Sequence, residues 1–291
     1  MRASLAFGLR GSEKKSDYEP KPIPKTTNPK ANNSKSKRRL MRGNQSRALL
    51  YIMSFGAGIA IWWAGSTIVH SQLFPTPVAV VDEMGRLFEK GQLTNDILAS
   101  LGRVALGFTL GVLCAIPVGF ATGWYGWVRG ALEPWINFFR SVPPLALIPM
   151  AIILLGIGSL PKYLVIALAA FLPTVVAIQQ GVTDVDITLL NAARVLGAKQ
   201  GTIFRRVVIP AVMPMAFTGM RIALGNSWAT LVAAELIASQ SGLGYITLQG
   251  QLYFDIPEII IGILLIGTLG VMMDRLIYVT QVRLTSWQER R

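Results

Sequence analysis

The residue types that most often perform chemistry in proteins are scarce in this chain. Only one cysteine, Cys114, and one histidine, His70, occur among its 291 residues. A single cysteine excludes a disulfide framework and a cysteine zinc site, and a single histidine excludes a histidine metal cluster and a Ser-His-Asp triad. The sequence also has no G-x-x-x-x-G-K-[ST] phosphate loop. We therefore predict that the chain is not an enzyme, holds no metal or cofactor, and leaves any ATP hydrolysis to another protein.

Four residues inside long apolar stretches are the candidates for function. They are Arg140, Arg221, Trp228 and Glu235. A charge within a membrane span is costly and usually faces the bundle interior or a water-filled path. Arg221 follows Pro210 by eleven residues, which is roughly 16 Å along a helix and close to the middle of a bilayer. It is therefore interpreted either as an anion-attracting group on a translocation pathway or as half of a structural ion pair with Glu235 or Asp274.

The other three candidates also have two interpretations each. Glu235 is a gate residue or an interfacial helix end. Arg140 lines the pathway or bonds carbonyl groups that are freed by Pro143 and Pro144, because proline has no backbone N–H. Trp228 lines the pathway or packs against lipid and neighbouring helices.

Six stretches of low charge predict the elements that position these residues. Hydrophobic residues make up 52% of the chain and charged residues 15%, whereas an average soluble domain is about 25% charged. A helix of about 20 apolar residues crosses the roughly 30 Å of hydrocarbon in a bilayer. Suitable stretches are 48–69, 104–123, 141–161, 163–183, 207–235 and 258–282. We expect an all-α, polytopic membrane protein with six transmembrane helices, in which Gly107-x-x-x-Gly111 and Gly119-x-x-x-Gly123 allow close helix contact.

Most of the positive charge lies in an N-terminal tail. Residues 1–47 hold 13 Lys and Arg against 3 Asp and Glu, which accounts for +10 of the net charge of +13. The composition predicts a basic, disordered cytoplasmic tail, with an organelle transit peptide as the alternative, and it gives no reason to expect nucleic-acid binding. Residues 48–291 form the transmembrane domain. Lys and Arg are concentrated in the tail, in residues 184–206 and at the C-terminus, and this distribution predicts that both termini lie in the cytoplasm. The predicted location of the protein is the inner (plasma) membrane.

Two shorter amphipathic regions lie between the spans. Residues 78–90 place Val81, Met84, Leu87 and Phe88 at helical spacing, which predicts a short helix on the outer surface. The inner loop 184–210 has a first apolar stripe at 189, 193 and 196, glycines at 197 and 201, and a second stripe at 203, 204, 207 and 208. This pattern predicts two short helices with a glycine elbow, which dock on lipid or in a groove of a partner.

The inner loop resembles the cytoplasmic signature of a known family, the permease subunit of type I binding-protein-dependent ABC importers. That signature is Glu-Ala-Ala, three residues, Gly, nine residues, and a short apolar stretch that ends in Pro. The corresponding residues here are Asn191-Ala192-Ala193, Arg194-Val195-Leu196, Gly197 and Val207-Val208-Ile209-Pro210. Asn191 replaces the glutamate, which puts any ion pair from that position in doubt.

The resemblance covers about residues 74–287 and is closest to permeases for nitrate, bicarbonate, taurine and alkanesulfonates. The stretches that carry it are Leu73–Pro77, Ser100–Arg103, Val142–Ala146, Gly156–Gly158, Thr218–Gly225, Val232–Leu236 and Ser241–Gly244. It implies the permease subunit of an ATP-driven importer that translocates a small anion of this group. The anion is delivered by an external binding protein.

The same resemblance implies the partners and the coupling residues. Residues 184–210 form a coupling helix that docks on separate ATPase subunits, which hold ATP and Mg, while a second permease copy completes the pathway. The implied coupling residues are Asn191, Ala192, Ala193, Arg194, Leu196, Gly197, Ala198, Phe204 and Pro210. Pro210 is expected to end the loop and to start the fifth span.

Two other functions compete with an importer subunit. A secondary transporter often has inverted repeats and paired broken helices, but the two halves of this chain have no convincing repeat. An intramembrane enzyme needs a catalytic cluster within the spans, and the single histidine and scattered carboxylates argue against one. Co-purification of an ATPase supports the importer alone.

Overall fold

The structure is a computed structural model that describes residues 50–51, 53–69 and 73–286. The predicted tail, residues 1–47, lies outside the described residues. The chain divides into two compact units, Met1–Ile59 and Ala60–Arg291, and all packing described below lies within the second. Every regular element of the described residues is helical. The labelled elements are α2 (Pro77–Glu89), α3 (Gln92–Trp124), α4 (Gly126–Ser141), η1 (Pro144–Leu147), α5 (Ile148–Leu155), α6 (Leu160–Thr183), α7 (Ile187–Val195), α8 (Gln200–Ile203), η2 (Phe204–Val208), α9 (Ile209–Ala238), α10 (Leu243–Leu252) and α11 (Ile256–Leu284).

The described residues contain four helices that are long and apolar enough to cross a membrane. These are α3, α6, the continuous helix Gln200–Ala238 and α11, and the bent pair of α4 with η1 and α5 raises the number to five if it is one span. The helix Met53–Val69, within the first predicted span, is apolar but shorter. The all-α membrane fold is therefore confirmed, whereas the predicted number of six spans is not.

The third predicted span, 141–161, is wrong as a single helix. Helix α4 ends at Ser141, and the helical segment Pro144–Leu155 follows at an angle of 87°. Val142 has an extended backbone, with φ −91° and ψ 117°, as expected for a residue that precedes a proline. Pro143 and Pro144 thus end one helix and begin the next. Apolar composition alone therefore missed the bend.

Pro210 lies in the first turn of α9, as predicted, but the predicted break between the inner loop and this helix is wrong. The chain is helical without interruption from Gln200 to Ala238. Phe204–Val208 forms a π-helical turn just before the proline, and the backbone N–H of Ile209 bonds the carbonyl of Phe204. The wider π turn accommodates the proline, which has no N–H of its own. Helices α8 and α9 are therefore joined without a loop between them.

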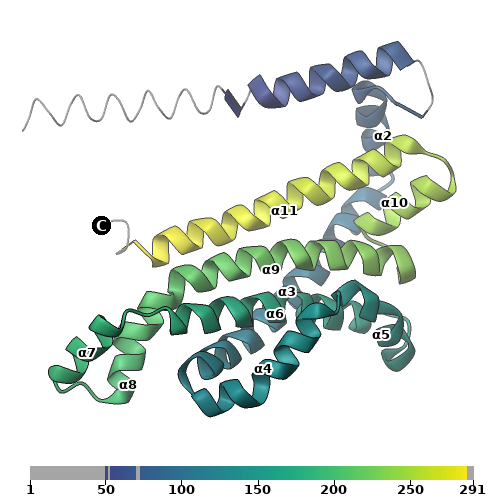
Figure 1. Cartoon of the computed structure of the whole chain (residues 1–291). Helices are drawn as coiled ribbons and strands as arrows, with labels where there is room; N and C mark the ends of the chain where they lie inside the picture. The colour runs from purple at the N-terminus through teal and green to yellow at the C-terminus, as the bar shows by residue number, and fades with distance from the viewer. Residues whose placement is uncertain (1–49, 52, 70–72, 287–291) are drawn as a thin grey trace, which may run out of the picture. The chain divides into compact units, whose positions relative to one another are not determined.

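Helices α3 and α6 lie side by side in Figure 1 and approach closely through glycines of α3. A Cβ atom at Gly107 would lie 2.7 Å from Ile166 Cγ2, and one at Gly119 would lie 2.8 Å from Ile178 Cβ. A Cβ atom at Gly111 would meet the backbone carbonyl of Ala167. The close contact that the two Gly-x-x-x-Gly pairs predict is confirmed.

We predict that Gly111→Leu strongly destabilises the fold, because a carbonyl of a helix backbone cannot move aside as a side chain can. Overpacking costs about 1–3 kcal/mol or more. Gly102→Leu is the matched control, since no atom lies within 4 Å of a Cβ at Gly102 on the same helix. The thermal midpoint of the purified protein in detergent should fall for the first variant only, and equal midpoints would contradict the packing described.

The amphipathic helix predicted for residues 78–90 is present as α2, and most of its apolar stripe faces away from the rest of the chain. Val80, Glu83 and Leu87 are buried, whereas Val81, Met84 and Phe88 are exposed. Leu87 alone of the apolar stripe is buried. Because lipid is as apolar as the protein interior, helical spacing of apolar residues in such a protein does not show which face packs on the chain.

Candidate functional site

The inner loop forms the two short helices and the glycine elbow that its sequence predicts. Gly197 has a left-handed backbone, with φ 77°. The N–H of Ala198 donates to the carbonyl of Ala193 at 3.0 Å, and the N–H of Gly197 donates to that of Arg194 at 2.9 Å. This pair of bonds is the Schellman motif that closes a helix at a glycine. It ends α7 and redirects the chain into α8.

One side of this loop is anchored to the transmembrane helices. Phe204 packs edge-on against Phe120 and Trp124 of α3, with ring centroids 5.6 and 5.3 Å apart. Ile203 and Val208 are buried in the same cluster, and Ala193 and Ala198 pack against it. The second apolar stripe of the loop is therefore part of the core, and it ties α8 to the end of α3.

The other side of the loop is apolar and faces outward. Val195 is 88% exposed and Leu196 is 86% exposed, directly before the glycine elbow. Asn191 accepts a hydrogen bond from Arg194 at 3.0 Å, so the residue that replaces the signature glutamate makes only a local contact. The predicted coupling residues thus lie together in one segment, with 191, 192, 194, 196 and 197 exposed and 193, 198, 204 and 210 partly buried.

Glu235 lies at the opposite end of α9, fully buried in a polar network. Its Oε1 accepts hydrogen bonds from Ser100 at 2.8 Å and from the guanidinium of Arg103 at 2.6 Å. Its Oε2 accepts the N–H of Gly244 at 2.9 Å. Arg103 also donates to the carbonyl and hydroxyl of Ser241, at 2.6 and 2.9 Å. The predicted gate role of Glu235 stays a prediction, and the network itself joins α3, α9 and α10.

Sequence reasoning missed the other members of this network. Asp96 Oδ1 accepts the N–H of Gly242 at 2.6 Å, and Ser100 accepts that of Leu243 at 2.8 Å. Lys162 is buried as well, at 5% exposure. One sequence feature could have pointed to these residues: Ser100–Arg103 and Ser241–Gly244 both belong to the stretches that carry the family resemblance. We call Asp96, Ser100, Arg103, Glu235 and residues 241–244 the α10 network.

Arg221 forms a bidentate ion pair with Asp274 of α11. Its Nε and one terminal nitrogen each lie 2.7 Å from a carboxylate oxygen. The two side chains are 36% and 37% exposed, and the Arg221 guanidinium lies 5.3 Å from the ring centroid of Tyr278. The sequence had left Glu235 and Asp274 open as partners, and the partner is Asp274. A role on the pathway stays a prediction.

Trp228 and Arg140 occupy contrasting environments. Trp228 is buried in the main apolar cluster, and its Nε1 has no hydrogen-bond partner among the described residues. Arg140 is exposed in the last turn of α4 and borders a polar groove shared with α6. No hydrogen bond from Arg140 to a proline-freed carbonyl occurs within the described part of the chain. A pathway role of either residue stays a prediction.

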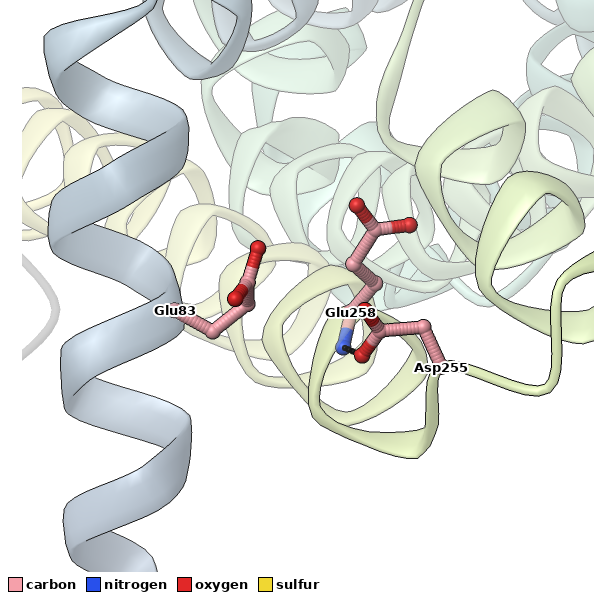
Figure 2. A group of neighbouring side chains, drawn as sticks. All are labelled: Glu83, Asp255 and Glu258. Atoms are coloured by element: carbon pink, nitrogen blue, oxygen red, sulfur yellow. Dashed lines mark hydrogen bonds between the residues drawn. The ribbon is translucent and has the colours of Figure 1, made fainter.

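A group of carboxylates lies where α2 meets the start of α11. Figure 2 shows Glu83 on α2 facing Asp255 and Glu258, and their carboxylate oxygens lie within 4.8 Å of one another. Two of these groups have local roles: Glu83 pairs with Arg86 at 2.8 Å, and Asp255 accepts the N–H of Glu258 at 3.4 Å as the helix cap. Three such carboxylates could hold a divalent cation, but no further feature of the described residues points to one.

Comparisons with known proteins agree with the resemblance. The family described as "Binding-protein-dependent transport system inner membrane component" matches residues 107–285. A probable ABC transporter permease protein of Brucella abortus is 55% identical over 83% of this chain and 96% of that protein. The taurine transport system permease protein TauC of Escherichia coli is 36% identical over 79% of this chain and 86% of TauC. A crystal structure of an amino acid ABC transporter superposes with a TM-score of 0.58 at 15% identity, over 69% of this chain and 97% of that chain.

This chain therefore belongs to the family of binding-protein-dependent transport system inner membrane components. It is a multi-pass permease subunit of an ABC importer, a class whose ATPase is a separate subunit. The likeness to the solved structure, at 15% identity, supports the fold alone.

Proposed function

We propose that this permease imports small oxyanions, of the nitrate, bicarbonate, taurine or sulfonate kind, that an external binding protein delivers. Two copies of the chain form the translocation unit in the inner (plasma) membrane, with both termini in the cytoplasm. Separate ATPase subunits bind ATP and Mg and dock on α7 and α8. Support for the substrate class comes from Arg140 and Arg221 within the spans and from the similarity to a taurine permease.

The observation that carries the proposal is the coupling surface formed by Val195, Leu196 and Gly197. Figure 1 shows α7 and α8 at the end of the second unit opposite α10. Two apolar side chains that are more than 85% exposed beside a rigid Schellman turn are suited to a hydrophobic groove of a partner. Because the helix Gln200–Ala238 is continuous, a pull on this surface moves α9 as one body.

We expect Leu196→Glu to abolish co-purification of the ATPase and ATP-driven uptake, since a carboxylate cannot enter an apolar groove without a large desolvation cost. The control is Ile157→Glu, because Ile157 is equally exposed, at 88%, and lies in the α5–α6 connection. Pull-down of the ATPase with the tagged permease measures the first effect, and uptake into cells the second. Normal pairing and uptake in Leu196→Glu would remove the coupling assignment, as would equal losses in both variants.

A further inference from the structure

A stripe of polar residues runs along α4, inside a segment otherwise suited to lipid. Arg129, Glu133, Asn137 and Arg140 are spaced i, i+4, i+8 and i+11 and therefore share one helix face. The last turns of α6 add Gln179, Gln180 and Thr183 across from them. Between the two helices lies a polar cavity of about 450 Å³. We call it the α4–α6 groove.

The rest of α4 is apolar and exposed, as a lipid-facing surface requires. Trp127, Trp135 and Phe138 are each more than 60% exposed. A polar stripe on a span seldom faces lipid, because an uncompensated polar group in hydrocarbon is costly, and it normally faces a water-filled path. The α4–α6 groove also ends at Thr183, four residues before the coupling helix α7 begins at Ile187. It therefore lies near the loop on which we propose that the ATPase docks.

The two arginines of the groove differ in how their side chains are engaged. Arg129 donates to the carbonyl oxygens of Thr122 at 3.1 Å and Gly123 at 2.9 Å, and thereby caps the end of α3. Arg140 has no hydrogen bond or ion pair with any described residue, and the same holds for Glu133. The groove thus presents one available guanidinium and one available carboxylate, seven residues apart on the same face, which is about 10 Å along the helix.

We propose that the α4–α6 groove binds a small zwitterion that carries an oxyanion at one end and an ammonium group at the other. Arg140 holds the oxyanion through the planar, two-pronged geometry of its guanidinium. Glu133 holds the ammonium group, and the amides of Asn137, Gln179 and Gln180 can bond either end. A plain anion gains only the first contact and meets the negative charge of Glu133. This inference rests on the proposed function and narrows its substrate class to amino-substituted oxyanions.

Two probes that differ only in the amino group test the charge pairing. The purified complex of permease and ATPase, in lipid nanodiscs, is titrated with radiolabelled taurine and with ethanesulfonate. The wild type should bind taurine more tightly. Glu133→Gln should weaken taurine binding about tenfold and leave ethanesulfonate binding equal or tighter, whereas Arg140→Gln should weaken both about tenfold. Glu89→Gln and Arg283→Gln, which remove exposed charges on α2 and α11, should change neither.

The possible results separate the groove from the proposed function. Unchanged binding of both probes in Glu133→Gln and Arg140→Gln, with ATP-driven oxyanion uptake intact in the wild type, would overturn the groove and leave the import function standing. Equal weakening of both probes by Glu133→Gln would overturn the role of the carboxylate. A wild-type importer that transports no oxyanion would overturn the proposed substrate class itself. Glu133→Ala and Arg140→Ala, which also remove the charges, serve in place of any variant that fails to assemble.

Discussion

Glu235→Ala is expected to destabilise the folded protein by about 3–5 kcal/mol, the cost of breaking a buried ion pair by removing one partner. Arg103, 8% exposed, would keep its charge but lose the carboxylate that it contacts directly. Ser100 and the N–H of Gly244 would also lose an acceptor, and an unsatisfied buried donor adds its own desolvation cost. The thermal midpoint in detergent and the yield of monodisperse protein measure the effect. Retention of both at wild-type values would contradict the α10 network.

A double variant separates the charge from the packing. Replacing both partners of a buried ion pair by apolar residues of similar volume is often neutral, so Arg103→Met with Glu235→Leu should recover part of the lost stability. Recovery should be incomplete, because the hydroxyl of Ser100 and the N–H of Gly244 still lack the carboxylate that accepts from them. Glu89→Ala, on the exposed face of α2, is the matched control and should leave the midpoint unchanged. A double variant less stable than Glu235→Ala would show that the cost does not come from the unpaired charge.

The α10 network also illustrates which part of a site a sequence pattern can predict. Ser100 and Glu235 are 135 residues apart, and Arg103 and Ser241 are 138 apart. Periodicity describes neighbours on one helix, so it does not show that two distant charges meet. The family resemblance marked three of the contributing stretches, yet only Glu235 was singled out, because it ends the long apolar stretch 207–235.

The coupling loop was predictable because its determinants are local. The Schellman turn depends on Gly197 and on carbonyls no more than five residues away, and the apolar stripes are read directly from spacing. Helix boundaries were less predictable. The bend after Ser141 and the continuity through Pro210 depend on how proline is accommodated, by an extended residue in one case and by a π turn in the other. Both segments are apolar, so composition does not show that the chain bends at one proline site and stays helical at the other.

The second large effect is expected for Arg221→Gln, which should reduce the assembled importer at least several-fold. The change leaves Asp274 within a membrane span without the guanidinium that bonds both its oxygens, and an unpaired carboxylate there is costly. Arg221→Gln combined with Asp274→Asn removes both charges. This double variant should restore assembly, because the two new side chains both end in an amide and can still hydrogen-bond to each other. Gel filtration of the permease with its ATPase measures assembly. A well-assembled Arg221→Gln complex would show that the ion pair is dispensable.

The double variant also tests the pathway role of Arg221, since assembly no longer limits it. If the guanidinium of Arg221 attracts the passing anion in addition to pairing with Asp274, an assembled double variant should take up oxyanions several-fold more slowly. At about 4 Å and an effective dielectric near 20, the attraction between two unit charges is about 4 kcal/mol before desolvation is subtracted, so even a fraction of it changes the rate measurably. Arg275, which stacks at 5.0 Å on the Tyr278 ring that Arg221 also contacts, supplies the control through Arg275→Gln. Wild-type uptake in the assembled double variant would assign Arg221 to structure alone, because the paired charges would then serve only to hold α9 against α11.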